Sequence, residues 1–362
     1  MSTKHETYKQ IVGLKFFFFF LQEKERMDRI RQLKQLYDSK DAQSLKASCK
    51  NSFVNQKQQE VQQGDSHLFQ SGTRPVCPLT MEKINRNDLY VADCLHCFDK
   101  ESIRQWVEVR KNLTCPICRQ HTVGFKVGNK YYLANRHLNY FSNKEISLGG
   151  WVAHTARVAK EVIINNDALV YGNARVSGSA QIMNKAHVYD NARVKGNAKI
   201  MDDAHVFGNA SVVGTSQVAD KAQVYGRAHV ENSSVFDEAQ VYGNAQVHGD
   251  SEIQDHAHVY GNARISLVSL IRAHAKVYGD AFVSWALVQG NATVSGNANI
   301  TKGAQIMDDA KIGGKTKIVG GIEVGGKVVI SQDISLMNTN VKRIMTEAQK
   351  RQALKRPSSS SS

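Results

Sequence analysis

The residues best suited to chemistry are cysteines, five of which fall between positions 77 and 118 of this 362-residue chain. Cys94 and His96 form a Cys-x-His pair, and a Cys-x-x-Cys pair, Cys115 and Cys118, begins nineteen residues after His96. Thiolate and imidazole donors in two short pairs are typical ligands of a tetrahedral zinc ion. We expect no secretory signal peptide before them, so the spacing favours one bound zinc ion over a disulfide framework.

These residues resemble the RING and U-box ubiquitin ligases, and the resemblance covers about 45 residues. In the RING pattern, the second zinc site falls on Cys94, His96, Cys115 and Cys118. The first site falls on Cys77, Thr80, Asp99 and Ser102. Only Cys77 is a good zinc ligand, so we expect this degenerate first site to hold no metal. Hydrogen bonds among Thr80, Asp99 and Ser102 would replace the metal, as polar networks do in U-boxes.

The resemblance implies an E3 ligase without a covalent intermediate, which binds a ubiquitin-charged E2 and positions the ubiquitin tail. The family's E2-binding positions match Leu79, Ile103, Trp106, Pro116 and Arg119. Ile103 and Trp106 lie three apart on one helix face, so either could belong to the core instead. Arg119 could equally be an ordinary surface charge. The one-zinc pattern also resembles the SP-RING of SUMO ligases, which makes a SUMO-type ligase the first alternative.

The elements downstream follow a six-residue period from Val152 to Ile330. An apolar residue returns every sixth position and a small residue follows four later, as in Val188-Tyr-Asp-Asn-Ala-Arg. Such a short period means that each repeat buries its apolar face only against its neighbours, which predicts a solenoid. An aromatic residue returns every eighteen residues, with one step of seventeen, at Tyr171, Tyr189, Phe207, Tyr225, Tyr242, Tyr260 and Tyr278. Eighteen residues make three hexads, so we expect about ten triangular coils of parallel β-helix.

We call these seven aromatic residues the aromatic ladder. Side chains alternate along a strand, so the repeated Val or Ile points inward and the ladder points outward. A row of His and Gln side chains lies on the other flank of each apolar position. The aromatic ladder is therefore the candidate substrate face, and the alternative is that it only stabilises the stacking of coils.

Residues 150–330 resemble the bacterial hexapeptide-repeat proteins, which form left-handed β-helices. Many of these are trimeric acyltransferases with a catalytic histidine, so acyltransferase activity and homo-oligomers are alternatives. Here the hexads run almost without interruption, and several histidines occupy outward positions: His187, His205, His229 and His258. A binding scaffold is therefore the favoured role, although fold alone does not decide function.

The predicted architecture is multidomain, with a small α+β zinc module followed by an all-β left-handed parallel β-helix. We expect a helical and linker segment over residues 1–72, a RING/U-box-like module over 73–122 and an aromatic joint over 123–150. A β-helix over 151–335 follows, and then a basic capping helix with a serine tail over 336–362. The capping helix, Val341 to Arg356, would cover the open edge of the last coil.

Charge argues against a nucleic-acid partner for the β-helix, and hydropathy argues against a membrane span in the N-terminal segment. The formal net charge is +14, yet residues 151–340 carry 17 basic and 17 acidic side chains, so the β-helix is a poor nucleic-acid surface. The apolar run Ile11 to Leu21, which contains Phe16 to Phe20, is too short to span a bilayer. It would pack on a neighbouring helix or the solenoid, or contact a partner or a membrane surface.

The sequence therefore predicts an E3 ubiquitin ligase that recruits its E2 through the zinc module and holds a protein substrate on the β-helix. Ligase chemistry of this kind is used in eukaryotes, whereas this repeat style is most familiar from bacteria. The combination suggests a bacterial effector in the host cytosol, and in any case a reducing intracellular compartment. The alternatives are a SUMO-type ligase, an acyltransferase, and a structural scaffold with a zinc cap.

Overall fold

The computed structural model describes residues 77–85, 88–92, 96–119, 123–140, 146–165, 167–337 and 343–344. All of them belong to one of the two compact units of the chain, Asp65–Ser362. The predicted N-terminal segment 1–72, with its Phe run, lies outside the described residues, and so does Cys94. Among the described helices, none is long and apolar enough to cross a membrane.

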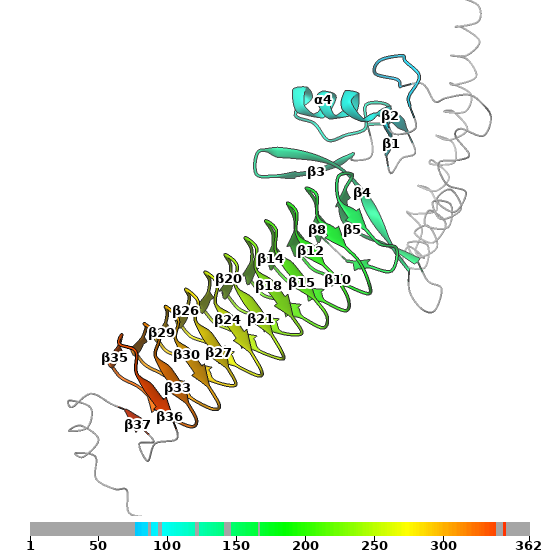
Figure 1. Cartoon of the computed structure of the whole chain (residues 1–362). Coiled ribbons are helices and arrows are strands. Elements are labelled where there is room, and N and C mark those ends of the chain that lie inside the picture. Colours follow the sequence, from blue (N-terminus) through cyan, green and yellow to red (C-terminus); the bar gives the residue numbers. More distant parts are fainter. Residues whose placement is uncertain are drawn as a thin grey trace, which may run out of the picture. The chain divides into compact units, whose positions relative to one another are not determined.

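The first described element is a small α+β module. Strands β1 (Leu89–Val91) and β2 (Cys97–Asp99) pair antiparallel, and helix α4 (Lys100–Arg110) follows directly (Figure 1). The Asp99 carboxylate accepts a hydrogen bond of 2.9 Å from the Ser102 backbone N–H, which caps the helix N-terminus. Lys111 ends the helix in the left-handed conformation, with φ 54°.

The core of this module is continuous with the segment that follows it. Its buried members are Cys77, Ile84, Leu89, Tyr90, Ala92, Phe98, Ile103, Val107, Cys115 and Val123. Ile103 and Val107 lie four residues apart, so both face inward from α4. A module with so few buried side chains gains substantially from any added cross-link.

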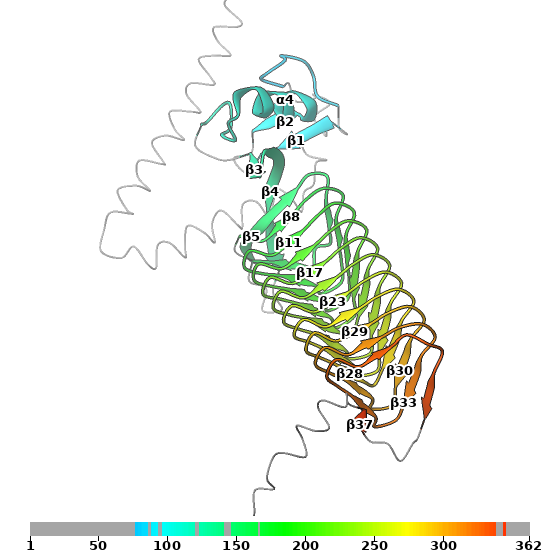
Figure 2. The ribbon, with the colours of Figure 1, turned by 90° about the vertical axis from the view of Figure 1, so that its left-hand side faces the viewer.

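The predicted aromatic joint is made of three strands: β3 (Gly124–Val127), β4 (Lys130–Tyr140) and β5 (Ile146–Ala153). They pair antiparallel in the order β3-β4-β5, with a register shift in the β4–β5 pair between Arg136 and Leu138. Strand β5 then pairs in parallel with the first strand of one solenoid side. The joint therefore extends a solenoid sheet, as Figure 2 shows, and that sheet begins before the predicted boundary at 151.

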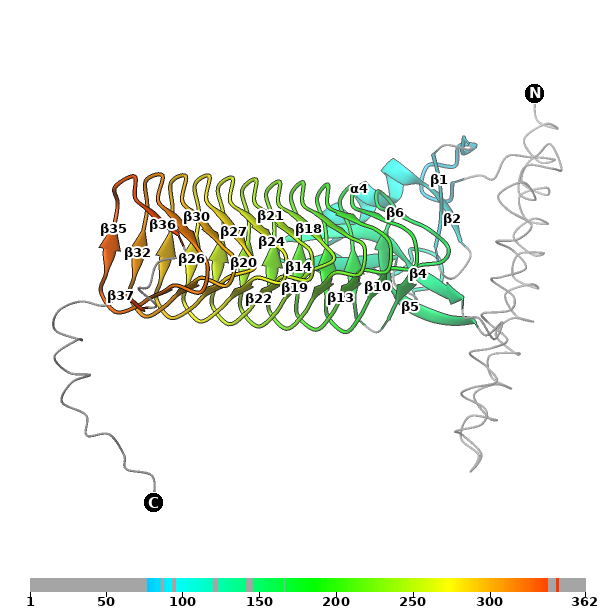
Figure 3. The same ribbon diagram turned by 60° about the horizontal axis from the view of Figure 1, so that its bottom comes forward.

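The remainder is a parallel β-solenoid of about ten coils, as the hexads predict (Figure 3). Its first side contains β6 (Arg157–Val158), β9 (Arg175–Val176), β12 (Arg193–Val194), β15 (Ser211–Val213), β18 (His229–Glu231), β21 (Gln246–His248), β24 (Arg264–Ser266), β27 (Phe282–Ser284), β30 (Asn299–Thr301), β33 (Lys317–Val319) and β36 (Ser335–Met337). The second side contains β7 (Ile163–Ile164), β10 (Gln181–Ile182), β13 (Lys199–Ile200), β16 (Gln217–Val218), β19 (Ser234–Val235), β22 (Glu252–Ile253), β25 (Leu270–Ile271), β28 (Leu287–Val288), β31 (Gln305–Ile306), β34 (Glu323–Val324) and β37 (Arg343–Ile344). The third side contains β8 (Leu169–Val170), β11 (His187–Val188), β14 (His205–Val206), β17 (Gln223–Val224), β20 (Gln240–Val241), β23 (His258–Val259), β26 (Lys276–Val277), β29 (Thr293–Val294), β32 (Lys311–Ile312) and β35 (Val329–Ile330).

The solenoid core consists of columns of identical or similar residues, one column for each side. Val188, Val206 and Val224 are fully buried and are partners in successive strand pairs of the third side. The small residue of each hexad is buried at the corner, as Ala192 and Ala210 show. Each coil therefore buries its apolar side chains against the coils above and below, which is the one-dimensional packing of repeat proteins.

Most corners are turned by Gly, Asn or Asp in the left-handed conformation, as the hexads predict. Five residues of the coils depart from this rule, Ala273, Lys302 and three large apolar residues: Leu267, Val268 and Trp285 have φ of 52°, 55° and 48°. They are also the most exposed apolar side chains of the coils before residue 329, at 63%, 66% and 62%. Positive φ is uncommon outside Gly, Asn and Asp, and a β-branched residue such as Val268 is a genuine outlier there.

The predicted C-terminal helix is wrong at its beginning. Arg343 and Ile344 form strand β37, which pairs in parallel with Glu323 and Val324 of β34. Ile344 packs on the solenoid core, so these residues continue an inward column of the second side. Pairing with the open edge satisfies backbone groups that a helix would leave exposed. The rest of the predicted helix and the serine tail lie outside the described residues.

Candidate metal centre and aromatic face

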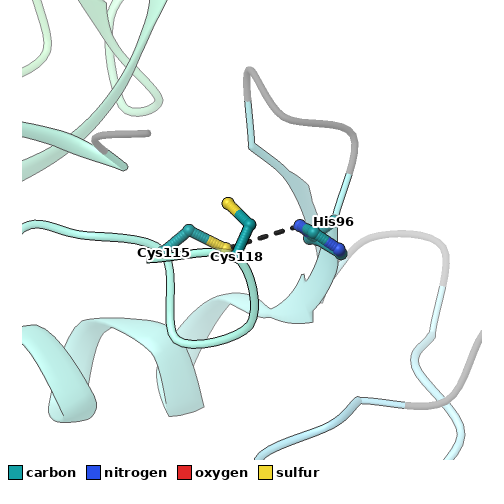
Figure 4. A group of neighbouring side chains, drawn as sticks. All are labelled: His96, Cys115 and Cys118. Atoms are coloured by element: carbon teal, nitrogen blue, oxygen red, sulfur yellow. Dashed lines mark hydrogen bonds between the residues drawn. The ribbon is translucent and has the colours of Figure 1, made fainter. Parts of the chain in front are cut away.

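Three of the four predicted zinc ligands lie together (Figure 4). The donor atoms of His96, Cys115 and Cys118 are all within 4.8 Å of one another, and Cys115 Sγ is 3.5 Å from His96 Nδ1. Zinc bonds of about 2.3 Å to sulfur and about 2.0 Å to nitrogen give a tetrahedral edge of about 3.5 Å. The donors therefore suit zinc chemically, and the Cys115–His96 distance equals that edge.

The local fold explains why these donors meet. His96 lies immediately before β2, and the two cysteines lie in the turn that follows α4. Since α4 begins directly after β2, the helix returns the chain toward the beginning of that strand. Within the turn, the Arg119 backbone N–H donates to the Cys115 carbonyl at 2.9 Å, which holds the Cys-Pro-Ile-Cys segment in one closed loop.

In the degenerate first site, the Thr80 side chain makes different hydrogen bonds from the side chains of Asp99 and Ser102. Asp99 Oδ1 accepts hydrogen bonds from the Ser102 backbone N–H at 2.9 Å and from the Ser102 hydroxyl at 2.8 Å. Thr80 instead accepts from the Glu82 backbone N–H at 3.3 Å and its hydroxyl reaches Cys77. The prediction of one network among Thr80, Asp99 and Ser102 is therefore wrong for Thr80. The reason is that the Thr80 hydroxyl is directed to Cys77 and to the Glu82 N–H, whereas Asp99 Oδ1 caps α4.

The Cys77 thiol lies in an environment that favours its thiolate. Burial raises the pKa of Cys77, but hydrogen bonds from the backbone at Asp99, Leu79 and Thr80 and from the Thr80 side chain outweigh it and lower the pKa overall. Within the described residues, no group of metal-type donors gathers around Cys77. The polar contacts of this site thus surround one cysteine and one helix cap.

The predicted E2-binding residues have different exposures. Leu79 and Trp106 are half-buried and pack on the module core, and Pro116 is also half-buried, while Arg119 is exposed. Ile103 is fully buried in the core, so its assignment to the E2 surface is wrong. It lies on the face of α4 that packs against Phe98 and its neighbours, and no partner can reach it.

A prominent apolar side chain of the module was not among the predicted site residues. Met81 is 77% exposed and follows Leu79 and Thr80 in a tight turn, in which its backbone N–H donates to the Cys77 carbonyl at 2.7 Å. The signal in the sequence was its position just after Cys-Pro-Leu-Thr. Large apolar side chains held out in water mark candidate contact surfaces, especially beside other apolar residues.

The module is joined to the solenoid through Tyr90. Its buried hydroxyl donates to the Val123 carbonyl at 2.9 Å and is 3.3 Å from the Ala134 carbonyl and from Asn135 Oδ1. Asn135 Nδ2 donates in return to the Val91 carbonyl at 3.1 Å. The Tyr90 ring stacks on His154 at a centroid distance of 5.7 Å. These contacts connect β1 with the joint and with the first coil.

The aromatic ladder is a continuous stack of rings along one corner of the solenoid. Successive centroids are 4.8–4.9 Å apart and successive ring planes differ by 8° or less. This distance equals the spacing of hydrogen-bonded strands, so the backbone sets the stacking. Burial and the neighbouring Asp190 raise the pKa of Tyr189 to about 12, so its phenol remains protonated at neutral pH.

The first ring of the aromatic ladder does not belong to the exposed face. Tyr171 is only 5% exposed, because Phe125 and Tyr132 of the β3–β4 hairpin cover it at centroid distances of 5.8 and 4.8 Å. Its inclusion in the substrate face is therefore wrong. The other six members remain partly exposed: Tyr189, Phe207, Tyr225, Tyr242, Tyr260 and Tyr278.

A shallow polar hollow lies beside the exposed part of the aromatic ladder. It is lined by Lys221, Gln223, Glu238, Gln240, His256 and His258. Lys221 Nζ is 2.9 Å from Glu238 Oε1, and His256 Nδ1 is 3.4 Å from Glu238 Oε2. Aromatic faces beside fixed charges and amides offer both apolar and polar contacts to a polypeptide.

A family model described as the YdcK beta solenoid repeat matches residues 168–183. The chain is similar to that solenoid repeat there. The match falls on β8, β9 and β10, which are consecutive strands of the three sides, and so supports the β-solenoid. No curated protein matches the chain.

The outward histidines of the third side, His187, His205 and His258, are neighbours of the aromatic ladder. Burial, together with neighbouring His205, lowers the pKa of His187 to about 4, while Asp203 acts weakly in the opposite direction. The Tyr171 hydroxyl lies 3.4 Å from His187 Nδ1. From residue 167 to residue 337, two to four residues separate consecutive strands, so no long loop projects there to build an enclosed acyltransferase site.

Proposed function

We propose that this chain is an E3 ubiquitin ligase in which a one-zinc RING/U-box-like module recruits a charged E2, and a left-handed hexapeptide-repeat solenoid holds the protein substrate. The observation that carries the proposal is the convergence of His96, Cys115 and Cys118 donors within 4.8 Å. Cys94, the fourth ligand in the proposal, lies outside the described residues. The host cytosol is the proposed compartment if the protein is a bacterial effector.

Zinc in this module would act as a cross-link rather than as a reagent. When bound, it would pin the segment before β2 to the turn after α4, which supplements the small core of the module. Catalysis then depends on how rigidly the module presents its surface to E2, since positioning alone can lower a barrier by several kcal/mol.

The surface offered to E2 combines apolar and charged side chains. Leu79 and Trp106 rest on the same core while keeping part of their surface in water. Arg119 follows the last zinc ligand and is exposed. A half-buried tryptophan supported from below is a typical energetic centre of a protein interface.

The solenoid contributes a substrate face at a set distance. Each coil advances by one strand spacing of about 4.8 Å, so the partly exposed members of the aromatic ladder lie at successive fixed distances from the first coil. The hollow formed by Lys221, Glu238 and His256 lies on the adjoining surface. An extended substrate segment could follow several coils and contact one ring per coil.

The test is discharge of ubiquitin from a panel of charged E2 enzymes by the full-length chain. We expect discharge that Cys115→Ala abolishes and Trp106→Ala reduces at least tenfold, a loss of about 1.4 kcal/mol in barrier lowering. Gln105→Ala is the matched control, because Gln105 is exposed on the same helix and its amide donates to Glu101 at 2.9 Å, outside the module core. Absence of discharge from every E2, with one zinc bound, would refute the proposal, and discharge of a SUMO-charged E2 alone would reassign it to the SUMO pathway.

A second candidate is a zinc-stabilised cap for the solenoid, and the contacts of Tyr90 favour it. Its hydroxyl joins β1 to the backbone of the hairpin at Val123 and Ala134. A cap predicts that Cys115→Ala destabilises the first coils, whereas a pure recruitment module predicts loss of discharge with the coils intact. Hydrogen exchange in residues 146–176, compared between the wild type and Cys115→Ala, distinguishes the two roles.

A further inference from the structure

Two histidines and one glutamate meet on the first side of the solenoid, far along the sequence from the zinc module. His229 and Glu231 are the first and third residues of β18, so both side chains point outward from the coil. His248 is the last residue of β21, and it is the register partner of Glu231 in the parallel β18–β21 pair. Adjacent coils thus supply the three side chains.

Their donor atoms are close enough to share one ion. Glu231 Oε2 is 3.7 Å from His229 Nε2 and 3.5 Å from His248 Nδ1, and all three donor atoms lie within 4.8 Å of one another. The two imidazole rings are 5.5 Å apart and inclined by 54°, so they converge on the carboxylate without stacking.

The backbone holds this arrangement in place. Strand β18 is hydrogen-bonded between β15 and β21, and β21 is in turn paired with β24. Val230 and Val247, the neighbours of these side chains, are fully buried in the core. A site built on paired strands is more rigid than one on a loop, which favours a preorganised set of ligands.

We propose that His229, Glu231 and His248 form an intrachain site for a divalent transition-metal ion such as zinc. Two imidazole nitrogens and one carboxylate suit zinc, nickel, copper and iron, whereas calcium and magnesium require mostly oxygen ligands. The side chains are 36%, 47% and 34% exposed, so a bound ion would retain open positions toward solvent. Water or a donor from a partner protein would fill them.

Another His–Glu pair of the solenoid, Glu238 and His256, has a different charge environment. Glu238 contacts His256 at 3.4 Å, but it also forms an ion pair with Lys221 at 2.9 Å, so an ammonium group already neutralises its charge. In the described part of the chain, no lysine or arginine is ion-paired with Glu231, and two imidazoles face its carboxylate. The cluster of His229, Glu231 and His248 therefore has both the negative charge and the donor atoms that a cation requires.

The test is cobalt binding by the chelator-treated, full-length chain, followed by absorption spectroscopy. Cobalt at the module produces thiolate-to-metal absorption, whereas cobalt at the solenoid site produces only ligand-field bands. We expect both the wild type and Cys115→Ala to bind cobalt with ligand-field bands from the solenoid site. His248→Ala should bind cobalt at this site more than about a hundredfold more weakly, because even the loss of an outer-shell partner costs about 10- to 100-fold in metal affinity. His256→Ala is the matched control and should bind as the wild type does.

Hydrogen exchange supplies a second readout. With zinc about 100-fold above its dissociation constant, local opening of β18 and β21 should slow about a hundredfold in the wild type but not in His248→Ala. His248 is on the surface, so its replacement leaves the buried column of Val247 intact. Equal metal uptake by the wild type and His248→Ala, or uptake that shows thiolate absorption only, would overturn the proposal. Either result leaves the ligase proposal untouched, because His96 and the cysteines are not involved.

Discussion

Replacing Gly226 by alanine should loosen the solenoid at one coil boundary. Gly226 has a φ of 72°, and a Cβ added there would lie 2.9 Å from the Gly243 backbone nitrogen and 3.1 Å from its oxygen. The next residue, Arg227, donates its backbone N–H to the same Gly243 oxygen at 2.6 Å. The methyl group would therefore push apart two backbones that are joined by this hydrogen bond.

A second glycine separates the two contributions to the cost. Gly303 has a φ of 84°, but nothing lies within 4 Å of an added Cβ. Alanine there bears only the left-handed backbone energy of about 1–2 kcal/mol, partly offset by about 0.4–1 kcal/mol from the less flexible unfolded chain. Gly226→Ala adds about 1–3 kcal/mol of overpacking. We expect totals of about 2–4 kcal/mol for Gly226→Ala and about 1 kcal/mol for Gly303→Ala.

Native-state hydrogen exchange is the suitable assay, because a repeat protein opens locally and has no single unfolding free energy. At about 1.4 kcal/mol per factor of ten, amides around Arg227 should exchange roughly 30- to 700-fold faster in Gly226→Ala. Amides around Gly303 should change by about fivefold in Gly303→Ala. Equal acceleration in the two variants would show that backbone conformation alone sets the cost and would refute the role of coil-to-coil contact.

Four further predictions concern the module, the aromatic ladder and the joint. Ile103→Ala should destabilise the module by about 2–5 kcal/mol because it empties a fully buried site, whereas Trp106→Ala should leave zinc binding intact while reducing E2 discharge; thermal unfolding and zinc content compare them. Phe207→Ala removes two stacked contacts at 4.9 and 4.8 Å and should weaken its coil by about 1–3 kcal/mol, measured by local hydrogen exchange. The folded-state pKa of His187, about 4, lies below its ordinary 6.5, so stability should be full above pH 6.5 and fall as the pH decreases toward 4, and His187→Gln should flatten this loss in pH-dependent unfolding. Tyr90→Phe loses the 2.9 Å bond to the Val123 carbonyl and should raise protease sensitivity in 123–135, at a cost of about 1 kcal/mol.

Each of these predictions has an opposite outcome. Zinc loss in Trp106→Ala would make that side chain part of the core, and a stable Ile103→Ala would contradict its burial in the module. Unchanged exchange around Phe207 would show that the rings stack without stabilising the coils. A pH profile that His187→Gln leaves unaltered would show that another group titrates. An unchanged cleavage pattern in Tyr90→Phe would show that the Tyr90 hydroxyl does not hold the module to the joint.

The solenoid could be predicted from the sequence because its determinants are local and periodic. Val218 and Val235 are seventeen residues apart, yet they are register partners, because the missing residue is dropped at the corner near Asn232. A turn can lose one residue without moving the inward column, so the count of apolar positions survives. The same periodicity, three hexads per coil, predicts that the residues of the aromatic ladder stack on one side.

The errors arise where non-periodic segments return to the coils. Tyr171 reads as one more ring of the aromatic ladder, but Phe125 and Tyr132 cover it through a hairpin that no repeat predicts. Ile103 and Trp106 share a helix face in sequence, and only the packing around Phe98 decides which one is fully buried. Such contacts are set by tertiary structure rather than by spacing.

The cluster of His229, Glu231 and His248 can be predicted from the spacing of the repeat. Glu231 and His248 are seventeen residues apart, which is the length of a shortened coil, so an alignment of outward rows brings them to the same register. One at a time, His187, His205, His229 and His258 read as solvated residues along the repeat. The cluster emerges only when each outward position is compared with its partner one coil later.

The length of a coil also governs which insertions and deletions this chain can accept. Duplication of an eighteen-residue segment would add one complete coil, keep every downstream side chain on its own side, and move the distal end outward by about 4.8 Å. Gain or loss of a single hexad would instead turn every later residue to a neighbouring side, which would divide the aromatic row between two sides and separate partners such as Glu231 and His248. Changes in length by whole coils are therefore the ones in which the reach of the protein can vary without altering its surfaces.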